Sequence, residues 1–135
     1  MVERNRCAVL VAEADPKDAR QVVTCLLELG MEVYLAMSKE DVFRWLHRRV
    51  FRRAVVAAEL TIGGEMLVAR LARLSAITRL IAVGPAGDLE VEARCRSAGA
   101  KAYIGRPVNV EMLGALLGVP AKRIRNRKTN ATNDS

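Results

Sequence analysis

The sequence predicts an α/β fold in which five parallel strands form one sheet with helices on both faces. Short apolar runs alternate with helical patterns five times along the chain. The run at residues 54–60 (AVVAAEL) is almost wholly apolar and rich in valine, which is typical of a strand buried on both faces. This run carries a carboxylate, Glu59, near its end, and open α/β sheets place their sites at the carboxyl edge. Glu59 is therefore the first candidate functional residue.

The apolar runs give the expected order of elements. Strands are predicted at residues 7–12, 31–36, 54–60, 79–83 and 101–104. Helices are predicted at residues 16–29, 39–50, 65–74, 89–97 and 110–117. The residues 61–64 (TIGG) are expected to form a turn between the third strand and the third helix.

Capping residues support these helix boundaries. Asp15, Ser38 and Asn109 are typical N-cap residues, and Pro16 suits the first position of the first helix. Glycines follow the ends of three helices, at Gly30, Gly99 and Gly118. Each predicted helix is long enough to cross from one parallel strand to the next.

Length and composition limit the classes of protein. The 135 residues suit one domain with a proper hydrophobic core. No apolar run approaches the ~20 residues that span a bilayer, and residues 1–6 do not resemble a signal peptide. Cys7, Cys25 and Cys95 are widely separated, which favours reduced thiols packed as small hydrophobic residues over a zinc site or a disulfide framework. We therefore expect a cytoplasmic protein with no membrane association.

The charge is unevenly distributed. Of the formal net charge of +7, a net +4 lies in residues 120–135. The cations of this segment are Lys122, Arg123, Arg125, Arg127 and Lys128. We expect a folded domain over residues 1–119 and a basic, disordered tail over 120–135, because the tail has almost no apolar content.

A second basic cluster surrounds the second helix and its exit. It consists of Arg44, Arg48, Arg49, Arg52 and Arg53. This cluster could contact an acidic partner, although a solvated face is the more common outcome. His47, the single histidine, has no acidic or cysteine partner in its helix, and we expect it at the surface.

Three stretches resemble one known family. They are residues 9–16 (VLVAEADP), 57–60 (AAEL) and 97–107 (SAGAKAYIGRP). The chain from residue 6 to 117 resembles the receiver domain of two-component response regulators, which has the flavodoxin-like fold of the chemotaxis type. The last stretch is the most specific, because the family has Gly-Ala, an aromatic residue and Lys-Pro in this order. The resemblance implies the strand order 2-1-3-4-5.

The residues that carry the chemistry of receivers are altered. A receiver binds Mg²⁺ and accepts a phosphoryl group on an aspartate, and the resemblance places Glu59 at this phosphoacceptor position. Glu13 and Ala14 fall on the two acidic positions, and Asp15 is a further candidate metal ligand that also suits an N-cap. Positions that contact the phosphoryl group or act as switches correspond to Gly84, Tyr103 and Arg106. We therefore expect a degenerate receiver (a pseudo-receiver) that is not an enzyme and takes no metal or cofactor.

Several alternatives stay open for these residues. Glu59 could imitate a phosphorylated aspartate, or it could be a buried carboxylate that only fills the emptied site. Tyr103 could be a switch or an ordinary packing residue. We expect Glu59 and Arg106 to form a direct ion pair, with the Arg106 fork also reaching Glu13.

Protein contact is the expected mode of action. In similar receivers, partners bind the face that corresponds to residues 89–97, 101–104 and 109–117, and a homodimer is possible. The alternative is a nucleic-acid-associated regulatory adaptor that uses the basic tail for phosphate contacts. An enzyme or small-ligand binder is a third class, but the sequence has neither a phosphate loop nor a nucleophile–base pair.

Overall fold

A five-stranded parallel sheet organises the computed structural model, which describes residues 7–119. Its strands are β1 (Ala8–Ala12), β2 (Glu32–Ala36), β3 (Arg53–Ala57), β6 (Arg79–Gly84) and β7 (Ala102–Gly105). Its helices are α1 (Pro16–Glu28), α2 (Lys39–Arg48), α3 (Leu67–Ala72), α4 (Leu89–Ala98) and α5 (Val110–Leu117). A small antiparallel pair, β4 (Thr61–Ile62) and β5 (Glu65–Met66), precedes α3.

The strand order in the sheet is β2-β1-β3-β6-β7. Every neighbouring pair is parallel. Counting only the strands of this sheet, the order is 2-1-3-4-5, so the predicted α/β class and topology are confirmed. β3 is the central strand, and the carboxyl ends of all five strands share one edge.

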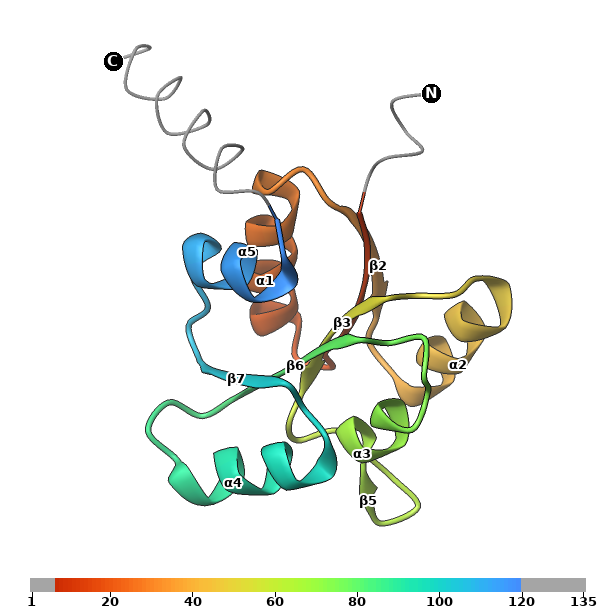
Figure 1. The fold of residues 1–135 in the computed structure, drawn as a ribbon, viewed down its shortest axis with the longest axis vertical. Helices are drawn as coiled ribbons and strands as arrows, with labels where there is room; N and C mark the ends of the chain where they lie inside the picture. Colours follow the sequence, from red (N-terminus) through yellow and green to blue (C-terminus); the bar gives the residue numbers. More distant parts are fainter. Residues whose placement is uncertain (1–6, 120–135) are drawn as a thin grey trace.

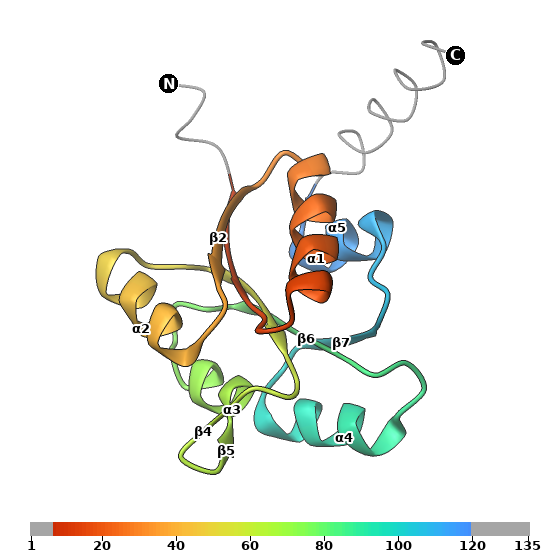
Figure 2. The same cartoon turned by 180° about the vertical axis from the view of Figure 1, so that it is seen from behind.

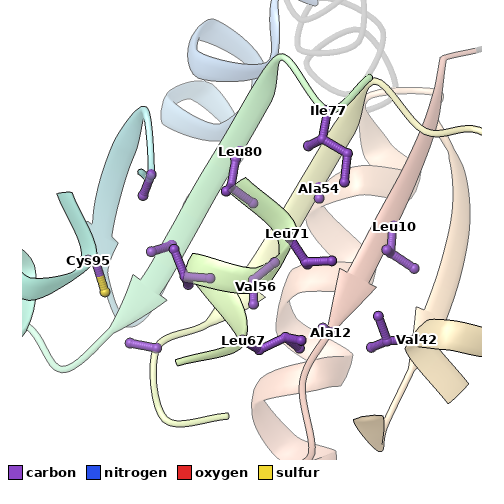
Figure 3. Close-up of a cluster of buried hydrophobic side chains, with 14 of the residues drawn as sticks. Leu10, Ala12, Val42, Ala54, Val56, Leu67, Leu71, Ile77, Leu80 and Cys95 are labelled. Carbon is purple, nitrogen blue, oxygen red and sulfur yellow. The ribbon is translucent and has the colours of Figure 1, made fainter. Parts of the chain in front are cut away.

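The two faces of the sheet are covered by different helices. α1 and α5 lie together on one face, and α2, α3 and α4 cover the other (Figures 1 and 2). Alternate residues of each strand therefore enter separate cores. On β3, Ala54 and Val56 face the core under α2, α3 and α4, and Val55 faces the core under α1 and α5. Figure 3 shows the larger core, with Leu67 and Leu71 of α3 packed over the sheet.

The predicted N-caps are confirmed. The side chains of Asp15, Ser38 and Asn109 accept hydrogen bonds from backbone N–H groups three residues later, at 2.9, 3.2 and 2.8 Å. Asp88 caps α4 in the same way through the N–H of Val91, at 3.1 Å; this cap was not predicted. Asp15 is therefore occupied as the N-cap of α1.

The segment after β3 differs from the prediction. β3 ends at Ala57 rather than at residue 60, and the expected turn at residues 61–64 belongs to the β4–β5 hairpin. Gly63 and Gly64 have φ values of 57° and 80°, which is the backbone of a tight two-residue hairpin turn. Residues 65 and 66 pair back with 62 and 61, so α3 begins at Leu67 instead of residue 65, and it ends at Ala72 instead of residue 74.

The second helix is also shorter than predicted. α2 ends at Arg48, and Arg49 is extended with φ −160° and ψ 164°. This change of direction buries Phe51, which lies just before β3 and is 1% exposed. It leaves Val50 74% exposed. Burial of the larger aromatic side chain accounts for the early end of the helix.

The cysteines and the termini complete the description. Cys95 is buried, and Cys7 and Cys25 are partly buried free thiols packed against the core, in agreement with their interpretation as small hydrophobic residues. No helix within residues 7–119 combines the length and apolar character required to cross a bilayer. The expected disordered tail at 120–135 lies outside the described residues.

Candidate functional site at the carboxyl edge of the sheet

Four charged side chains from separate elements meet where the central strands end. Glu13 follows β1 directly, Glu59 lies two residues after β3, and Arg106 follows β7 directly. Asp18 projects from the first turn of α1. We call these four residues the carboxyl-edge cluster. Parallel pairing aligns the strand ends, which is why residues far apart in the chain converge here.

Arg106 is the centre of this cluster. Its Nη1 donates to Glu59 Oε2 at 2.8 Å and its Nη2 donates to Glu59 Oε1 at 2.7 Å. This is the two-bond fork geometry that suits a guanidinium and a carboxylate. The same Nη2 donates to Glu13 Oε1 at 3.1 Å. The predicted ion pair, and the predicted reach to Glu13, are therefore confirmed.

The two glutamates differ in exposure. The Glu13 side chain is 7% exposed, whereas that of Glu59 is 54% exposed. Of the alternative that made Glu59 a buried carboxylate paired with Arg106, the pairing holds and the burial does not, because the chain leaves β3 at Ala57 and carries Glu59 beyond the edge of the sheet. Glu13 is the buried carboxylate. Its Oε2 accepts a hydrogen bond from the N–H of Asp15 at 3.1 Å.

Asp18 is a third carboxylate on the arginine, and the sequence analysis missed this role. Its Oδ2 lies 3.3 Å from Arg106 Nε, close enough for an ion pair but without a hydrogen bond to that buried nitrogen. The position of Asp18 one turn after the acidic run at residues 13–15 is the signal that could have placed it at this edge.

Hydrogen bonding shifts the protonation equilibria of the cluster. The two bonds from Arg106 lower the pKa of Glu59, against a smaller opposing effect of desolvation. Hydrogen bonds to Glu59, and to a smaller extent to Glu13, raise the pKa of Arg106. Burial acts in the opposite direction and lowers this pKa. Arg106 is therefore permanently cationic, and Glu59 is ionised at neutral pH.

A second feature lies over the end of β6. Tyr103 of β7 donates from its hydroxyl to the carbonyl of Pro85 at 2.7 Å. A Cβ atom on Gly84 would lie 2.5 Å from the Tyr103 hydroxyl oxygen and 3.1 Å from its Cζ. The tyrosine ring therefore occupies the space that any side chain at position 84 would need. Its burial raises the pKa of Tyr103.

The residues of this edge do not fit Mg²⁺, which the resemblance to receivers implies. Mg²⁺ requires octahedral oxygen ligands from a few carboxylates and waters. The Arg106 guanidinium lies between Glu13 and Glu59 and is bonded to both. Position 14 is alanine, and the Asp15 carboxylate is directed to the N-terminus of α1. A cation would have to displace an arginine that already compensates the carboxylates.

The remaining predicted residues lie away from this edge. His47 is exposed on α2, with Nδ1 at 2.9 Å from the carbonyl oxygen of Phe43. Arg53 does not join a basic surface, because its Nε donates to the carbonyl of Leu117 at the end of α5 at 2.8 Å. Arg44 is paired with Asp41 at 2.6 Å. The basic cluster predicted around α2 is thus divided among different contacts. The cations predicted for the tail lie outside the described residues.

Comparisons of sequence and of structure give different outcomes. No protein-family model and no curated protein matches the chain. The signal receiver domain of an HD domain-containing protein from Pseudomonas fluorescens has a TM-score of 0.71, 18% identity and coverage of 93% of this chain and 99% of its own. The chemotaxis response regulator CheY4 of Vibrio cholerae has a TM-score of 0.70 and 17% identity, with coverage of 86% of this chain and 100% of its own.

A third solved structure is an atypical orphan response regulator, described as having a phosphorylation-independent regulatory mechanism. Its TM-score is 0.67 at 19% identity, with coverage of 87% of this chain and 95% of its own. Identities this low support the fold. This chain has the fold of the response regulator receiver domain.

Proposed function

We propose that the protein is a pseudo-receiver: a signalling module that acts through protein contact, without aspartyl phosphorylation and without enzyme activity. One observation carries the proposal. The Arg106 guanidinium is bonded to both Glu13 and Glu59, so a cation of the chain itself occupies the position between the carboxylates. The carboxyl-edge cluster is thereby neutralised internally.

Three further departures support the loss of phosphotransfer. Glu59 places its oxygens one methylene further from the backbone than an aspartate would. Gly84 has no hydroxyl to donate to a phosphoryl oxygen, and Tyr103 fills the space above it. Arg106 is engaged by three carboxylates and is not available to a phosphoryl group. The role of Glu59 in this proposal is to hold Arg106, which is the structural alternative of the two left open.

The proposed partner surface is the face formed by α4, β7 and α5. Leu89 on α4 is 76% exposed and Met112 on α5 is 48% exposed. Exposed apolar side chains of this size are typical anchors for a protein partner when several occur on one face. A signalling partner, or a second copy of the chain, would bind there.

Nuclear magnetic resonance spectra with and without a phosphoryl analogue test the proposal. The ¹⁵N-labelled full chain is titrated with Mg²⁺ and beryllium fluoride, which together imitate a phosphorylated aspartate. We expect no shift of the amide signals of Glu13, Glu59 or Arg106. Saturable shifts at these residues would contradict the proposal. A Glu59→Asp, Arg106→Lys variant is the comparison, because it restores two of the altered groups.

The partner surface is tested separately. Leu89→Asp and Met112→Asp variants of the full chain should lose proteins that co-purify with the unmodified chain in its own cells. Unchanged co-purification would assign the contacts to another face. The alternative function, a nucleic-acid-associated adaptor, depends on the tail, and no contact within residues 7–119 favours it over the first.

A further inference from the structure

A groove lies between α2 and α3 at the amino edge of the sheet, opposite the carboxyl-edge cluster. The two helices are side by side in both views of the fold (Figures 1 and 2). The hollow has a volume of about 500 Å³. Its apolar lining comes from α2 and from the loops that enter β3 and β6, and α3 contributes Arg70. The apolar residues are Phe43, Leu46, Val50, Phe51, Leu74 and Ile77. We call this hollow the α2–α3 groove.

The apolar lining is only partly covered. Val50 is 74% exposed and Leu74 is 40% exposed, whereas Phe51 and Ile77 form a buried floor. Val50 is exposed because α2 ends at Arg48 to bury Phe51. The groove therefore offers apolar surface to a partner without any unfolding of the domain.

The charge around the groove has one sign. Arg49 and Arg70 line it together with His47, and no carboxylate is among its lining residues. The Arg70 guanidinium carbon lies 5.5 Å from the centre of the Phe43 ring. Arg49 donates to the hydroxyl of Tyr34 and lies 3.7 Å from Glu32 Oε1 in an exposed pair. Glu32 offsets part of the charge of Arg49, whereas Arg70 forms no ion pair with a carboxylate within residues 7–119.

Two more arginines add to this positive charge. Arg48 and Arg52 are exposed and adjoin the lining residues His47, Arg49 and Phe51 in the chain, and neither forms an ion pair with a carboxylate within residues 7–119. The chain segment 120–135 is itself basic and therefore does not complement this surface. The groove requires an occupant that supplies both apolar side chains and negative charge.

We propose that the α2–α3 groove is a docking site for an acidic amphipathic helix of another protein. Apolar side chains at i, i+3, i+4 and i+7 of that helix would fill the hollow. Glutamates or aspartates beside them would face Arg48, Arg49 and Arg70. Charge complementarity would speed association and set the orientation, and burial of the apolar side chains would hold the complex. This surface is separate from the α4–β7–α5 face of the proposed function.

Fluorescence anisotropy with synthetic peptides tests this inference on the full chain. The probe is a labelled helix-forming peptide with leucines at i, i+3, i+4 and i+7 and glutamates on the adjoining positions. The comparison peptide carries lysines in place of the glutamates. We expect saturable binding of the acidic peptide that weakens as salt is raised. We expect no binding of the basic peptide.

Matched variants locate the binding site. Val50→Asp should weaken binding of the acidic peptide by at least ~10-fold, whereas Leu27→Asp, at an exposed apolar position on α1, should change it by less than ~2-fold. Arg70→Glu should weaken binding, and Arg94→Glu on α4 is its charge control. All four positions are exposed, so thermal unfolding should show each variant folded.

Five outcomes would overturn the inference. The first four are no saturable binding of the acidic peptide, equal binding of the basic peptide, equal loss in Val50→Asp and Leu27→Asp, and self-association of the unmodified chain that Val50→Asp abolishes. The fourth would assign the groove to a second copy. Displacement of the acidic peptide by vesicles of an anionic phospholipid would likewise assign it to a membrane surface, against the proposal.

Discussion

The two edges of the sheet use arginine in opposite ways. At the carboxyl edge, one arginine faces three carboxylates, and its side chain is only 20% exposed. At the amino edge, Arg49 and Arg70 line an apolar hollow that no carboxylate lines. The residue type is the same at both edges, but its neighbours differ. Arg106 is compensated by carboxylates of the chain itself, whereas Arg70 forms no ion pair within residues 7–119, and we propose that a partner supplies the negative charge there.

The largest expected effect is the loss of Arg106. Arg106→Met would leave the buried Glu13 without its cation, so we expect the free energy of unfolding to fall by ~3 kcal/mol. Arg70→Met at the amino edge should cost less than ~0.5 kcal/mol, because Arg70 is exposed and has no carboxylate bonded to it in the described part of the chain. Urea unfolding at pH 7 measures both. Equal losses in the two variants would break the comparison between the edges.

A side chain at position 84 tests the packing of the carboxyl edge. Gly84→Ser should destabilise the protein by ~2 kcal/mol, because its Cβ would overlap the Tyr103 hydroxyl. The same substitution in a Tyr103→Ala background should cost much less. Thermal unfolding of the single and double variants measures the difference. If Gly84→Ser is equally costly in both backgrounds, Tyr103 does not occupy that space.

Double-mutant cycles would rank the two glutamates on Arg106. We expect a coupling energy of ~1 kcal/mol between Arg106→Met and Glu59→Gln, because Glu59 is half exposed. The coupling energy between Arg106→Met and Glu13→Gln should be larger, because Glu13 is buried. Chemical unfolding of the unmodified chain and the five variants supplies both values. Additive effects in the Glu59 cycle would show that the observed ion pair contributes nothing to stability.

The smallest expected effect is a pH dependence. Arg106 lowers the pKa of Glu59 below 4.5, so the folded state binds fewer protons there than the unfolded state. The contribution of Glu59 to stability is then complete above about pH 4.5 and is lost as the pH falls through the lowered folded pKa. Between pH 3 and 6, the free energy of unfolding should therefore change less steeply with pH in Glu59→Gln than in the unmodified chain. An identical pH profile would contradict the lowered pKa.

The exposed pair of Glu65 and Arg73 is the control for this measurement. Arg73 bonds both oxygens of Glu65 at 2.9 Å, and it too lowers the carboxyl pKa. The Arg73 side chain is 58% exposed, against 20% for Arg106, so solvent screens this pair more strongly. Glu65→Gln should change the same profile less than Glu59→Gln does.

The sequence predicted the sheet and its order because buried parallel strands leave continuous apolar runs such as residues 54–60. It also predicted the contact of Glu59 with Arg106, since strand ends in such a sheet converge. The exposure of Glu59 could not be predicted in this way. It depends on where β3 ends, which the hairpin of Gly63 and Gly64 decides through its pairing.

Other features depend on tertiary packing alone. The approach of Asp18 to Arg106 depends on the direction of α1 relative to the sheet, and an apolar pattern does not record this direction. The end of α2 at Arg48 was missed because the helical pattern continues to Val50, and burial of Phe51 overrides it. The exposure of Val50 in the groove follows from that same change. The sequence indicated the basic cluster around α2 as a possible contact for an acidic partner, but it did not indicate the apolar hollow.

Intact-mass measurement after treatment with acetyl phosphate and Mg²⁺ is the decisive test of the proposed loss of phosphotransfer. We propose that the carboxyl-edge cluster, with Arg106 between Glu13 and Glu59, does not accept a phosphoryl group. We therefore expect an unchanged mass for the full chain. A mass increase of one phosphoryl group that disappears in Glu59→Ala would contradict it.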